Sequence, residues 1–364
     1  MKENWTYKKL GEIAKISSGK AIPSCEISET LSDGFYPCYG GNGLRGYVDH
    51  YSHVGLTPVI GRVGALCGNV HLPQDKFYAT EHALVVILKT NDKPHFIEYI
   101  LGSLNLRQYA KGVAQPVLSA SSLSDIPIPI PPMEEQERIV AELDLLQSVI
   151  DKKKAQLDEY DKLAQSIFYE MFGDPIDNPK KWEVKKLGEV GTIIAGSTPS
   201  TNDDSNWDGE VNWVTPAELG EQLFYGETKR KLTEKGAKGL TMMPVGTVLL
   251  SSRAPIGKLA ITTVPMCCNQ GFKNIICSES INNIFLYFYL MQTMDFVQAL
   301  GRGVIFKEVS KNAISTYKVC LPPLSLQQSF AEKIEAIEHQ KELVKQSLNE
   351  VKTLFDSRMD YYFN

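Results

Sequence analysis

The stretch IPPMEEQERIVAEL, from Ile130 to Leu143, returns later in the chain as LPPLSLQQSFAEKI, from Leu321 to Ile334. Each copy begins with two prolines and continues as an amphipathic run with a glutamine near its start. Pro132 and Pro323 are 191 positions apart, and a similar spacing relates the segments that begin at Ala110 and Leu300. The chain therefore contains an internal repeat.

The repeat also has a recognisable beginning. WTYKKLGEIAKISSGKAIPS, from Trp5, matches WEVKKLGEVGTIIAGSTPS, from Trp182, at a spacing of 177 positions. Because the spacing grows from 177 to 191, the second copy carries about 14 additional residues. We expect them between Asp203 and Lys238.

The segments after the two Pro-Pro pairs have the four-three apolar spacing of a coiled coil. Proline at the start pre-sets helical dihedrals, and Glu134, Glu135 and Glu137 place negative charge at the positive end of the first helix. In the second segment, Ser325 and Gln328 predict a capping box. The predicted contact positions are Ile139, Leu143, Leu146, Ile150, Lys153, Leu157, Tyr160, Ala164, Ile167 and Met171, and then Phe330, Ile334, Ile337, Lys341, Val344, Leu348, Val351, Phe355, Arg358 and Tyr362.

About 38 residues at 1.5 Å each give helices roughly 57 Å long, too long to be buried in one small domain. The first helix connects one globular part to the other, and the second leaves the latter. Pairing within the chain must therefore be antiparallel, with the two globular parts related by an approximate two-fold axis. A parallel homodimer through each helix is the alternative.

The predicted fold class is mixed α/β (α+β): two globular domains joined by two long helices that form an antiparallel coiled coil. Short apolar runs such as ALVVILK, from Ala83, and GTVLLSS, from Gly246, predict strands, and segments following His95 and Ile284 predict one helix in each copy. The predicted boundaries are residues 1–133 for the first domain, 134–172 for the central helix, 173–324 for the second domain and 325–364 for the C-terminal helix.

Composition restricts the cellular setting and the partners. The chain has no apolar run of about 18 residues and no signal-like N-terminus, so we expect no membrane span. Its seven cysteines show no C-x-x-C spacing, which favours a reducing cytoplasm over a disulfide framework. The net charge of −5 divides into +1, −5, +1 and −2 over the four predicted segments, so the globular parts are near neutral and compatible with a local basic face.

In combination, these motifs resemble the specificity subunits of type I restriction-modification systems. The resemblance rests on WxxKKLGE at Trp5 and Trp182, on the two Pro-Pro helix segments, and on several shorter motifs in the same order. These are YGGNGLRGY at Tyr39, IGRVGALCG at Ile60, NWVTPAEL at Asn212, SSRAPIGKLAI at Ser251 and CNQGF at Cys268.

The resemblance implies two target-recognition domains, each reading one half of a split site in double-stranded DNA. It also implies that the helices space these domains and bind two methyltransferase (M) subunits, with restriction (R) subunits completing the complex. A non-catalytic subunit without cofactor is expected. The rival hypothesis is a coiled-coil scaffold whose globular ends bind proteins and not DNA.

Patterns typical of catalysis have simpler explanations in this sequence. Pro-Pro occurs only as IPPM and LPPL, so the amine-holding loop of amino-methyltransferases is missing, and GGNGLRG predicts a tight turn. The acids near Asp174, with Glu183 and Lys185, resemble a nuclease motif, but the first copy has Thr6 where the second has Glu183. We interpret His50 and His53 as surface residues, and no metal site is predicted.

Candidate DNA-binding residues are the polar and basic side chains of glycine-rich loops, where backbone amides can approach phosphate and an Arg or Asn can reach a base edge. Arg62 with Arg253, and Lys111 with Arg302, occupy comparable places in the repeat, which favours phosphate contacts for these pairs. The full set is Tyr39, Asn42, Arg45, Arg62, Lys111 and Gln115 in the first copy, and Arg253, Lys258, Asn269, Gln270, Arg302 and Lys307 in the second.

Overall fold

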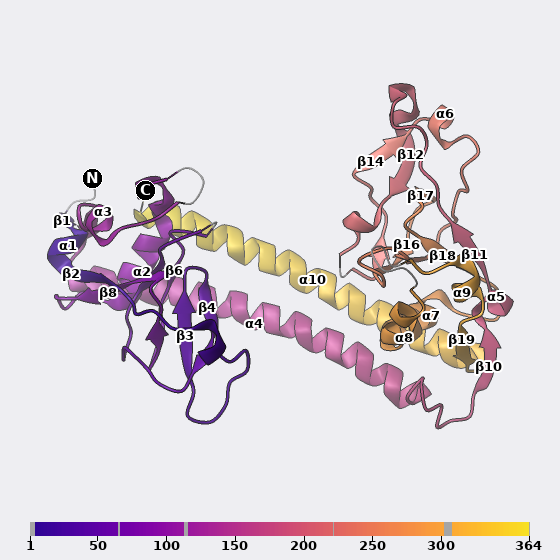
Figure 1. Ribbon diagram of the computed structural model, residues 1–364, viewed down its shortest axis with the longest axis horizontal. Coiled ribbons are helices and arrows are strands. Elements are labelled where there is room, and N and C mark those ends of the chain that lie inside the picture. Colours follow the sequence, from indigo (N-terminus) through magenta and orange to yellow (C-terminus); the bar gives the residue numbers. More distant parts are fainter. Residues whose placement is uncertain (1–3, 65, 113–115, 221, 302–307, 364) are drawn as a thin grey trace. The chain divides into compact units, whose positions relative to one another are not determined.

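A computed structural model describes residues 4–64, 66–112, 116–220, 222–301 and 308–363. Two 40-residue helices, α4 (Met133–Phe172) and α10 (Leu324–Phe363), follow the two Pro-Pro pairs, as predicted. Figure 1 shows each as a continuous ribbon, α4 in magenta and α10 in yellow. The chain divides into two compact units, residues 1–154 with 346–364 and residues 155–345, so each unit contains part of both long helices.

The first unit is built on small sheets. One sheet has the order β2-β8-β5-β6, a second has the order β4-β3-β7, and β1 pairs with β9 just before α4. β3 and β7 are parallel, whereas the other strand pairs in this unit are antiparallel. The elements are β1 (Thr6–Lys9), α1 (Leu10–Ile13), β2 (Ala14–Ser18), β3 (Tyr36–Gly40), β4 (Gly43–Val48), β5 (Val59–Gly61), β6 (Val70–His71), β7 (Tyr78–Ala79), β8 (Ala83–Leu88), α2 (Pro94–Ser103), α3 (Ala120–Ser124) and β9 (Pro127–Ile130).

The second unit repeats this topology with additions. Its sheets have the orders β11-β18-β15-β16-β13 and β14-β12-β17, and β10 pairs with β19 just before α10. The additional strand β13 and helix α6 lie within the segment where extra residues were expected. The elements are β10 (Glu183–Lys186), α5 (Leu187–Val190), β11 (Gly191–Ala195), β12 (Trp207–Val214), β13 (Phe224–Tyr225), β14 (Arg230–Leu232), α6 (Glu234–Ala237), β15 (Val248–Leu250), β16 (Leu259–Thr262), β17 (Cys267–Cys268), β18 (Lys273–Cys277), α7 (Asn283–Gln292), α8 (Met294–Ala299), α9 (Lys311–Ser315) and β19 (Lys318–Leu321).

An apolar helix connects each sheet to the long helices. α2 contributes Phe96 and Ile100 to a core that also contains Ile139 and Leu143 of α4. In the second unit, Phe285 of α7 lies in a core with Phe168 of α4 and Phe330 of α10. The predicted helix of each copy is shorter than expected: α2 is followed by a 3-10 turn (Leu106–Tyr109), and α7 is followed by α8. The cores therefore include the ends of the long helices.

A buried glutamine fastens the start of each long helix. Gln136 accepts a hydrogen bond from the Lys93 backbone N–H at 3.0 Å and donates to the Pro131 carbonyl at 3.1 Å. Gln327 does the same with the Asn282 N–H at 2.8 Å and the Pro322 carbonyl at 2.8 Å. The predicted Ser325–Gln328 capping box is wrong, because α10 already begins at Leu324 and Ser325 lies inside the helix. The glutamines of the repeated phrase instead accept the backbone N–H of the N-cap residue of α2, in the case of Gln136, and of α7, in the case of Gln327.

The coiled-coil contact positions predicted for α4 and α10 are confirmed, since none of the twenty side chains is exposed. In the first unit, Arg358 of α10 binds Glu142 of α4, and in the second unit Lys341 of α10 binds Asp161 of α4. Residue numbers rise along one helix as they fall along the other, so the two helices of one chain are antiparallel. Within the described ranges, no helix is long and apolar enough to cross a membrane.

Candidate nucleic-acid interface

A glycine turn between β3 and β4 forms the centre of the candidate site in the first unit. Gly43 has φ +87°, a conformation that favours glycine, and a Cβ there would lie 2.7 Å from Nε2 of His71. Gly61 also needs to be glycine, because its Cβ would lie 2.2 Å from the Gly41 carbonyl oxygen. Backbone therefore packs directly on backbone at Gly61, while Asn42 and Leu44 of the turn are exposed.

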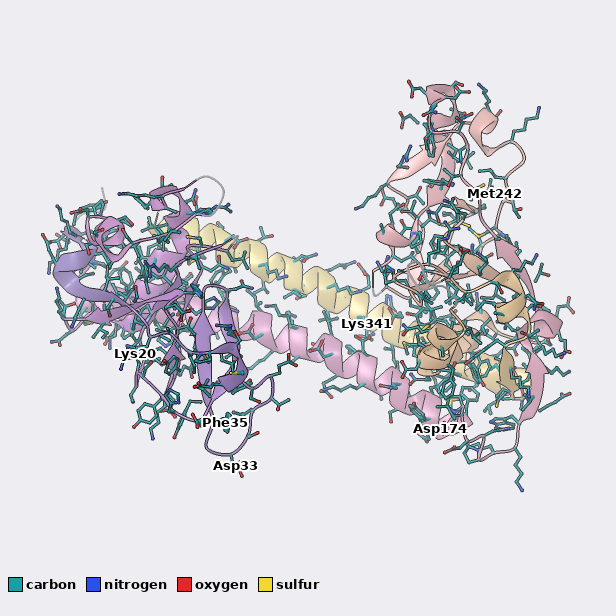
Figure 2. All side chains as sticks on the ribbon, viewed as in Figure 1. Lys20, Asp33, Phe35, Asp174, Met242 and Lys341 are labelled. Carbon is teal, nitrogen blue, oxygen red and sulfur yellow. The ribbon has the colours of Figure 1, made fainter. Side chains whose placement is uncertain are left out.

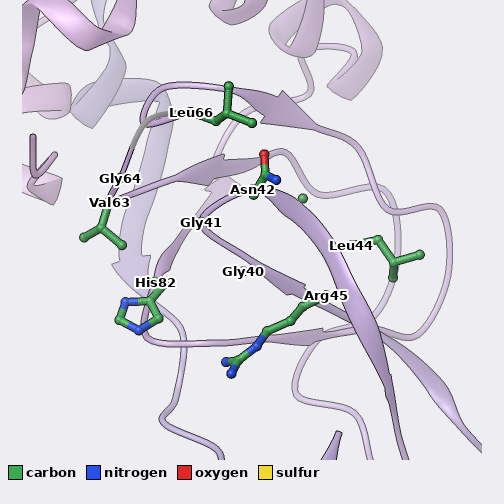
Figure 3. A pocket seen from close by; sticks show the side chains of 10 residues that line it. Gly40, Gly41, Asn42, Leu44, Arg45, Val63, Gly64, Leu66 and His82 are labelled. Carbon is green, nitrogen blue, oxygen red and sulfur yellow. The ribbon is translucent and has the colours of Figure 1, made fainter. Parts of the chain in front are cut away.

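A pocket of about 490 Å³ lies over this turn. Figure 3 shows Arg45 and His82 on one side of the glycine backbone and Asn42 and Leu66 on the other. Asn42, Arg45, Leu66 and His82 are all exposed. The lining residues are Gly40, Gly41, Asn42, Gly43, Leu44, Arg45, Val63, Gly64, Leu66 and His82. This pocket offers a cation, an amide and bare backbone within one small surface.

Arg45 and Tyr39 are positioned by the β3–β4 hairpin. The Arg45 guanidinium donates to Ser24 Oγ at 2.7 Å, which leaves further donors for a ligand. Tyr39 is half-buried, with its ring edge-on to Phe77 at 5.9 Å. Burial raises the pKa of Tyr39, so its hydroxyl remains protonated at neutral pH. The structure thus brings Tyr39, Asn42 and Arg45 together on one hairpin, as the sequence suggested.

Arg62 is turned toward the protein. Its guanidinium group donates to Leu118 O at 3.3 Å, to Ser18 Oγ at 3.2 Å and to Glu81 O at 3.3 Å. These bonds connect the loop after β5 to other segments. The Arg62 side chain therefore stabilises the loop that lines the pocket and is not itself one of the lining residues. Lys111 is exposed on the neighbouring segment, whose backbone pairs with Val117. Gln115 lies outside the described residues.

The backbone hydrogen bonds show which loops of the second unit correspond to the pocket. Arg62 N–H binds His82 O, and Ser252 N–H binds Gly271 O in the same way. The residue equivalent to Arg62 is therefore Ser252, and Arg253 corresponds to the next residue, Val63. The predicted equivalence of Arg62 and Arg253 is one position out of register. Arg253 nevertheless lies on the loop of the second unit that is equivalent to the pocket-lining loop after β5 in the first unit.

Arg253 belongs to a chain of charges. Its Nε donates to Glu308 Oε2 at 3.0 Å, and Lys273 Nζ lies 3.1 Å from Glu308 Oε1. The Lys273 side chain is 9% exposed, whereas that of Arg253 is 48% exposed, so one cation is structural and the other faces solvent. Burial alone would raise the pKa of Glu308, but the hydrogen bonds from Lys273 and Arg253 outweigh it and lower the pKa.

Asn269 and Gln270 follow β17 and lie near this loop. The Asn269 carboxamide oxygen accepts the Gly271 N–H at 2.9 Å and shapes the turn. Gln270 is exposed and accepts a hydrogen bond from Thr198 Oγ1 at 2.6 Å. Since Gly271 is equivalent to His82, Gln270 is equivalent to Glu81. The two units therefore present the same backbone surface with different side chains.

Two groups of candidates fall elsewhere. Lys258 is half-buried, and its ammonium group donates to Leu219 O at 2.7 Å. It lines a separate pocket with residues of α4 and α10, among them Asp161 and Lys341, so the structure does not bring it together with Arg253. Arg302 and Lys307 lie outside the described residues.

The sequence reasoning missed His82 and Glu308. His82 lines the pocket but stands after a strand, without the glycine neighbours that identified the other loops. Glu308 is a carboxylate, a type that we did not seek for a DNA surface, and only its contact with Arg253 reveals it. Of the two histidines interpreted as surface residues, His50 is exposed beside Asp49, whereas His53 is half-buried and stacks on Phe77.

Comparison with known proteins gives relatives of one kind. A specificity subunit from Methanocaldococcus jannaschii, of the type I restriction enzyme MjaIX, is 37% identical over 160 residues, covering 42% of this chain and 37% of the relative. The EcoprrI specificity subunit from Escherichia coli is 44% identical over 138 residues, or 38% of this chain and 34% of the relative. In both alignments the chain spans about a third of the relative's length.

A solved structure agrees over nearly the whole chain. The S subunit of a type I restriction-modification system from M. genitalium matches with a TM-score of 0.62, over 98% of this chain and 95% of that one. The sequence identity is 16%, so this likeness concerns the fold. The model of the type I restriction modification DNA specificity domain matches twice, over residues 2–159 and 179–353, which is most of both repeats. The chain therefore belongs to the type I restriction modification DNA specificity domain family.

Proposed function

We propose that this chain is the DNA sequence-recognition subunit of a type I restriction-modification complex, in which each globular part reads one half of a bipartite duplex site. The observation that carries the proposal is the double match to the specificity-domain family on one repeated backbone. The corresponding loops carry different side chains, Val63 and Glu81 in one unit and Arg253 and Gln270 in the other. Two diverged readers imply two different half-site sequences.

The chemistry of the loops suits base and phosphate contacts. An arginine can donate two hydrogen bonds to guanine, and Asn or Gln can pair with adenine in the same bidentate way. Bare glycine backbone lets amide groups approach phosphate oxygens. Arg45, Asn42 and Gln270 are exposed and therefore available for such contacts. Arg62, with its three contacts inside the protein, is assigned to support of the loop.

The long helices are proposed to space the two readers and to bind two methyltransferase subunits, with restriction subunits completing the complex. The chain itself is proposed to be non-catalytic and to need no cofactor, because its only Pro-Pro pairs begin helices and do not form an amine-holding loop. The seven cysteines are free thiols, which supports a place in the cytoplasm.

Selection of bound duplexes from a random pool tests the proposal. The chain, alone or with its methyltransferase subunits, should enrich a split motif, and binding should weaken steeply with salt. Arg45→Ala should relax one half of the motif and leave the other unchanged, whereas Lys162→Ala, on the exposed face of α4, should change neither. A protein scaffold would enrich no motif, and that result would overturn the proposal.

A further inference from the structure

The two long helices carry charges at contact positions that break the symmetry of the repeat. Lys341 is 8% exposed, and its ammonium group lies 2.6 Å from Asp161 of α4 and 2.6 Å from Glu338 of its own helix. Figure 2 labels Lys341 on α10. A buried lysine at a coiled-coil contact position lowers stability unless it is paired, and it therefore selects its partner.

A second polar cluster lies in the first unit. Arg358 of α10 donates to Glu142 Oε2 of α4 at 3.0 Å, and the Tyr362 hydroxyl donates to the same oxygen at 2.6 Å. Arg138 of α4 donates to the Tyr362 hydroxyl at 3.1 Å. In both clusters the acid that crosses to the other helix comes from α4 and the base comes from α10.

The repeat shows what each helix would meet in a copy of itself. Because the helices are related by 191 positions, the places of Glu142 and Asp161 are taken in α10 by Lys333 and Lys352. In an antiparallel pair of two α10 helices in the same register, Arg358 would face Lys333 and Lys341 would face Lys352. Each repulsive pair would occur twice.

A pair of two α4 helices would fail for a different reason. The places of Lys341 and Arg358 are taken in α4 by Ile150 and Ile167. Glu142 and Asp161 would then each face an isoleucine. Each Asp161 would lose Lys341, and each Glu142 would lose Arg358 and keep only Arg138 of its own helix, at 3.8 Å. Neither helix can satisfy its contact charges with a copy of itself, whereas α4 with α10 satisfies both sets.

We propose that the pairs Glu142–Arg358 and Asp161–Lys341 form a charge code that makes α4 select α10 and reject a second copy of either helix. Specificity of this kind needs a repulsive element against the wrong partner as well as attraction to the right one. Lys333 and Lys352, which are both exposed in this structure, supply the repulsion. The inference concerns helix pairing alone and does not depend on DNA recognition.

The code can be reversed in the full-length chain. In K341E/R358E, both contacts with α4 become repulsive, while two α10 helices gain attraction between Lys333 and the new carboxylate at position 358, and between Lys352 and the new carboxylate at position 341. Light scattering after gel filtration should show about twice the mass of the unsubstituted chain. Carbodiimide cross-linking should join Lys333 of one chain to position 358 of a second chain. These two positions are too far apart on one helix to react within a single chain. The unsubstituted chain should instead give a Lys341–Asp161 product.

Two further variants separate this result from misfolding. Adding K333E/K352E to K341E/R358E makes the α10 pair repulsive again and should abolish the dimer. Adding E142K/D161K to K341E/R358E restores opposite charges between α4 and α10, and should return the α4–α10 cross-link and most of the lost Tm. The proposal is overturned if K341E/R358E keeps the original mass and gives no product joining Lys333 to position 358, if adding K333E/K352E leaves the assembly intact, or if adding E142K/D161K rescues nothing.

Discussion

Gln136 and Gln327 are the side chains by which the repeated phrase joins each long helix to its globular part. Each is almost fully buried, and each accepts the backbone N–H at the start of α2 or α7. Replacing either by leucine keeps the volume but leaves that N–H and a proline carbonyl without a partner. We expect Gln136→Leu and Gln327→Leu each to lower the free energy of unfolding by about 1–3 kcal/mol, measured by denaturant titration.

Gln340→Leu is the matched control, since Gln340 is exposed on α10. It should change stability by less than about 0.5 kcal/mol. Equal effects of all three substitutions would show that the buried amides do not hold the helix starts.

Arg253 and Lys273 share Glu308 but should behave differently on substitution. Arg253→Ala removes an exposed cation, and Glu308 retains Lys273, so we expect weaker DNA binding with a nearly unchanged Tm. Lys273→Ala removes a buried cation from Glu308, which is partly exposed and keeps Arg253, so it should destabilise the fold by about 1–3 kcal/mol. Thermal melts and DNA titrations of both variants check this. A collapsed Tm with normal DNA affinity in Arg253→Ala would assign Arg253 to structure.

At the level of elements, the contact of α2 with α4 contains an acid in an unfavourable setting. Burial and the nearby Asp144 carboxylate raise the pKa of Glu98 to about 7. Between its ordinary value and about 7, folded Glu98 binds a proton that the unfolded chain does not. Glu98 therefore does not destabilise the fold at low pH. As pH rises through this window, its ionisation lowers the free energy of unfolding, by about 1–3 kcal/mol once the pH exceeds 7.

The variant Glu98→Gln should remove this dependence, and its Tm should exceed that of the unsubstituted chain at pH 8 but not at pH 4.5. The groups that face Glu98 are His95, at 4.0 Å on the same helix, and Asp144 of α4. Identical pH profiles for the two proteins between pH 4.5 and 8 would contradict the assignment.

The long helices were predictable because their signals are local and repeated: a Pro-Pro start and a contact pattern sustained over ten positions. The entry to each helix was only partly predictable. Ser325 and Gln328 matched a capping box, but the rigid prolines already start α10 at Leu324, and the buried Gln327 makes a contact with Asn282 that sequence spacing does not reveal.

The candidate site was predictable as a set of loops but not as individual contacts. Glycine spacing found the β3–β4 turn with Asn42 and Arg45. It could not show that Arg62 turns inward to three acceptors, because that depends on segments 44 and 56 positions away. Nor could it separate Lys258, which pairs with a distant carbonyl, from Arg253, which faces solvent.

For the whole molecule, both long helices pass between the two units, near residues 154 and 346. If the helices space the two readers, one heptad inserted after Lys154 and one after Lys345 should preserve the contacts within each unit. The insertion lengthens each helix by about 10.5 Å, which corresponds to about three base pairs. Three pairs also rotate the second half-site by roughly 100°, so we expect a longer gap together with weaker binding.

Sequencing of methylated sites in cells that carry the insertion checks this expectation. The half-site sequences should stay the same while the gap grows by about two to four pairs. An unchanged gap with full activity would mean that the helices do not set the distance. Altered half-site sequences would mean that the residues that read DNA lie near the insertion points in the long helices and not in the loops named above.

The central claim is that this one chain selects a split DNA sequence through two different readers. The most direct measurement is a genome-wide map of methylated bases in host cells with the gene, without it, and with the gene restored as Arg45→Ala. We predict a bipartite motif, methylated once on each strand, that disappears on deletion and returns with one relaxed half in the Arg45→Ala strain. A methylation map that is the same in all three strains would contradict the claim.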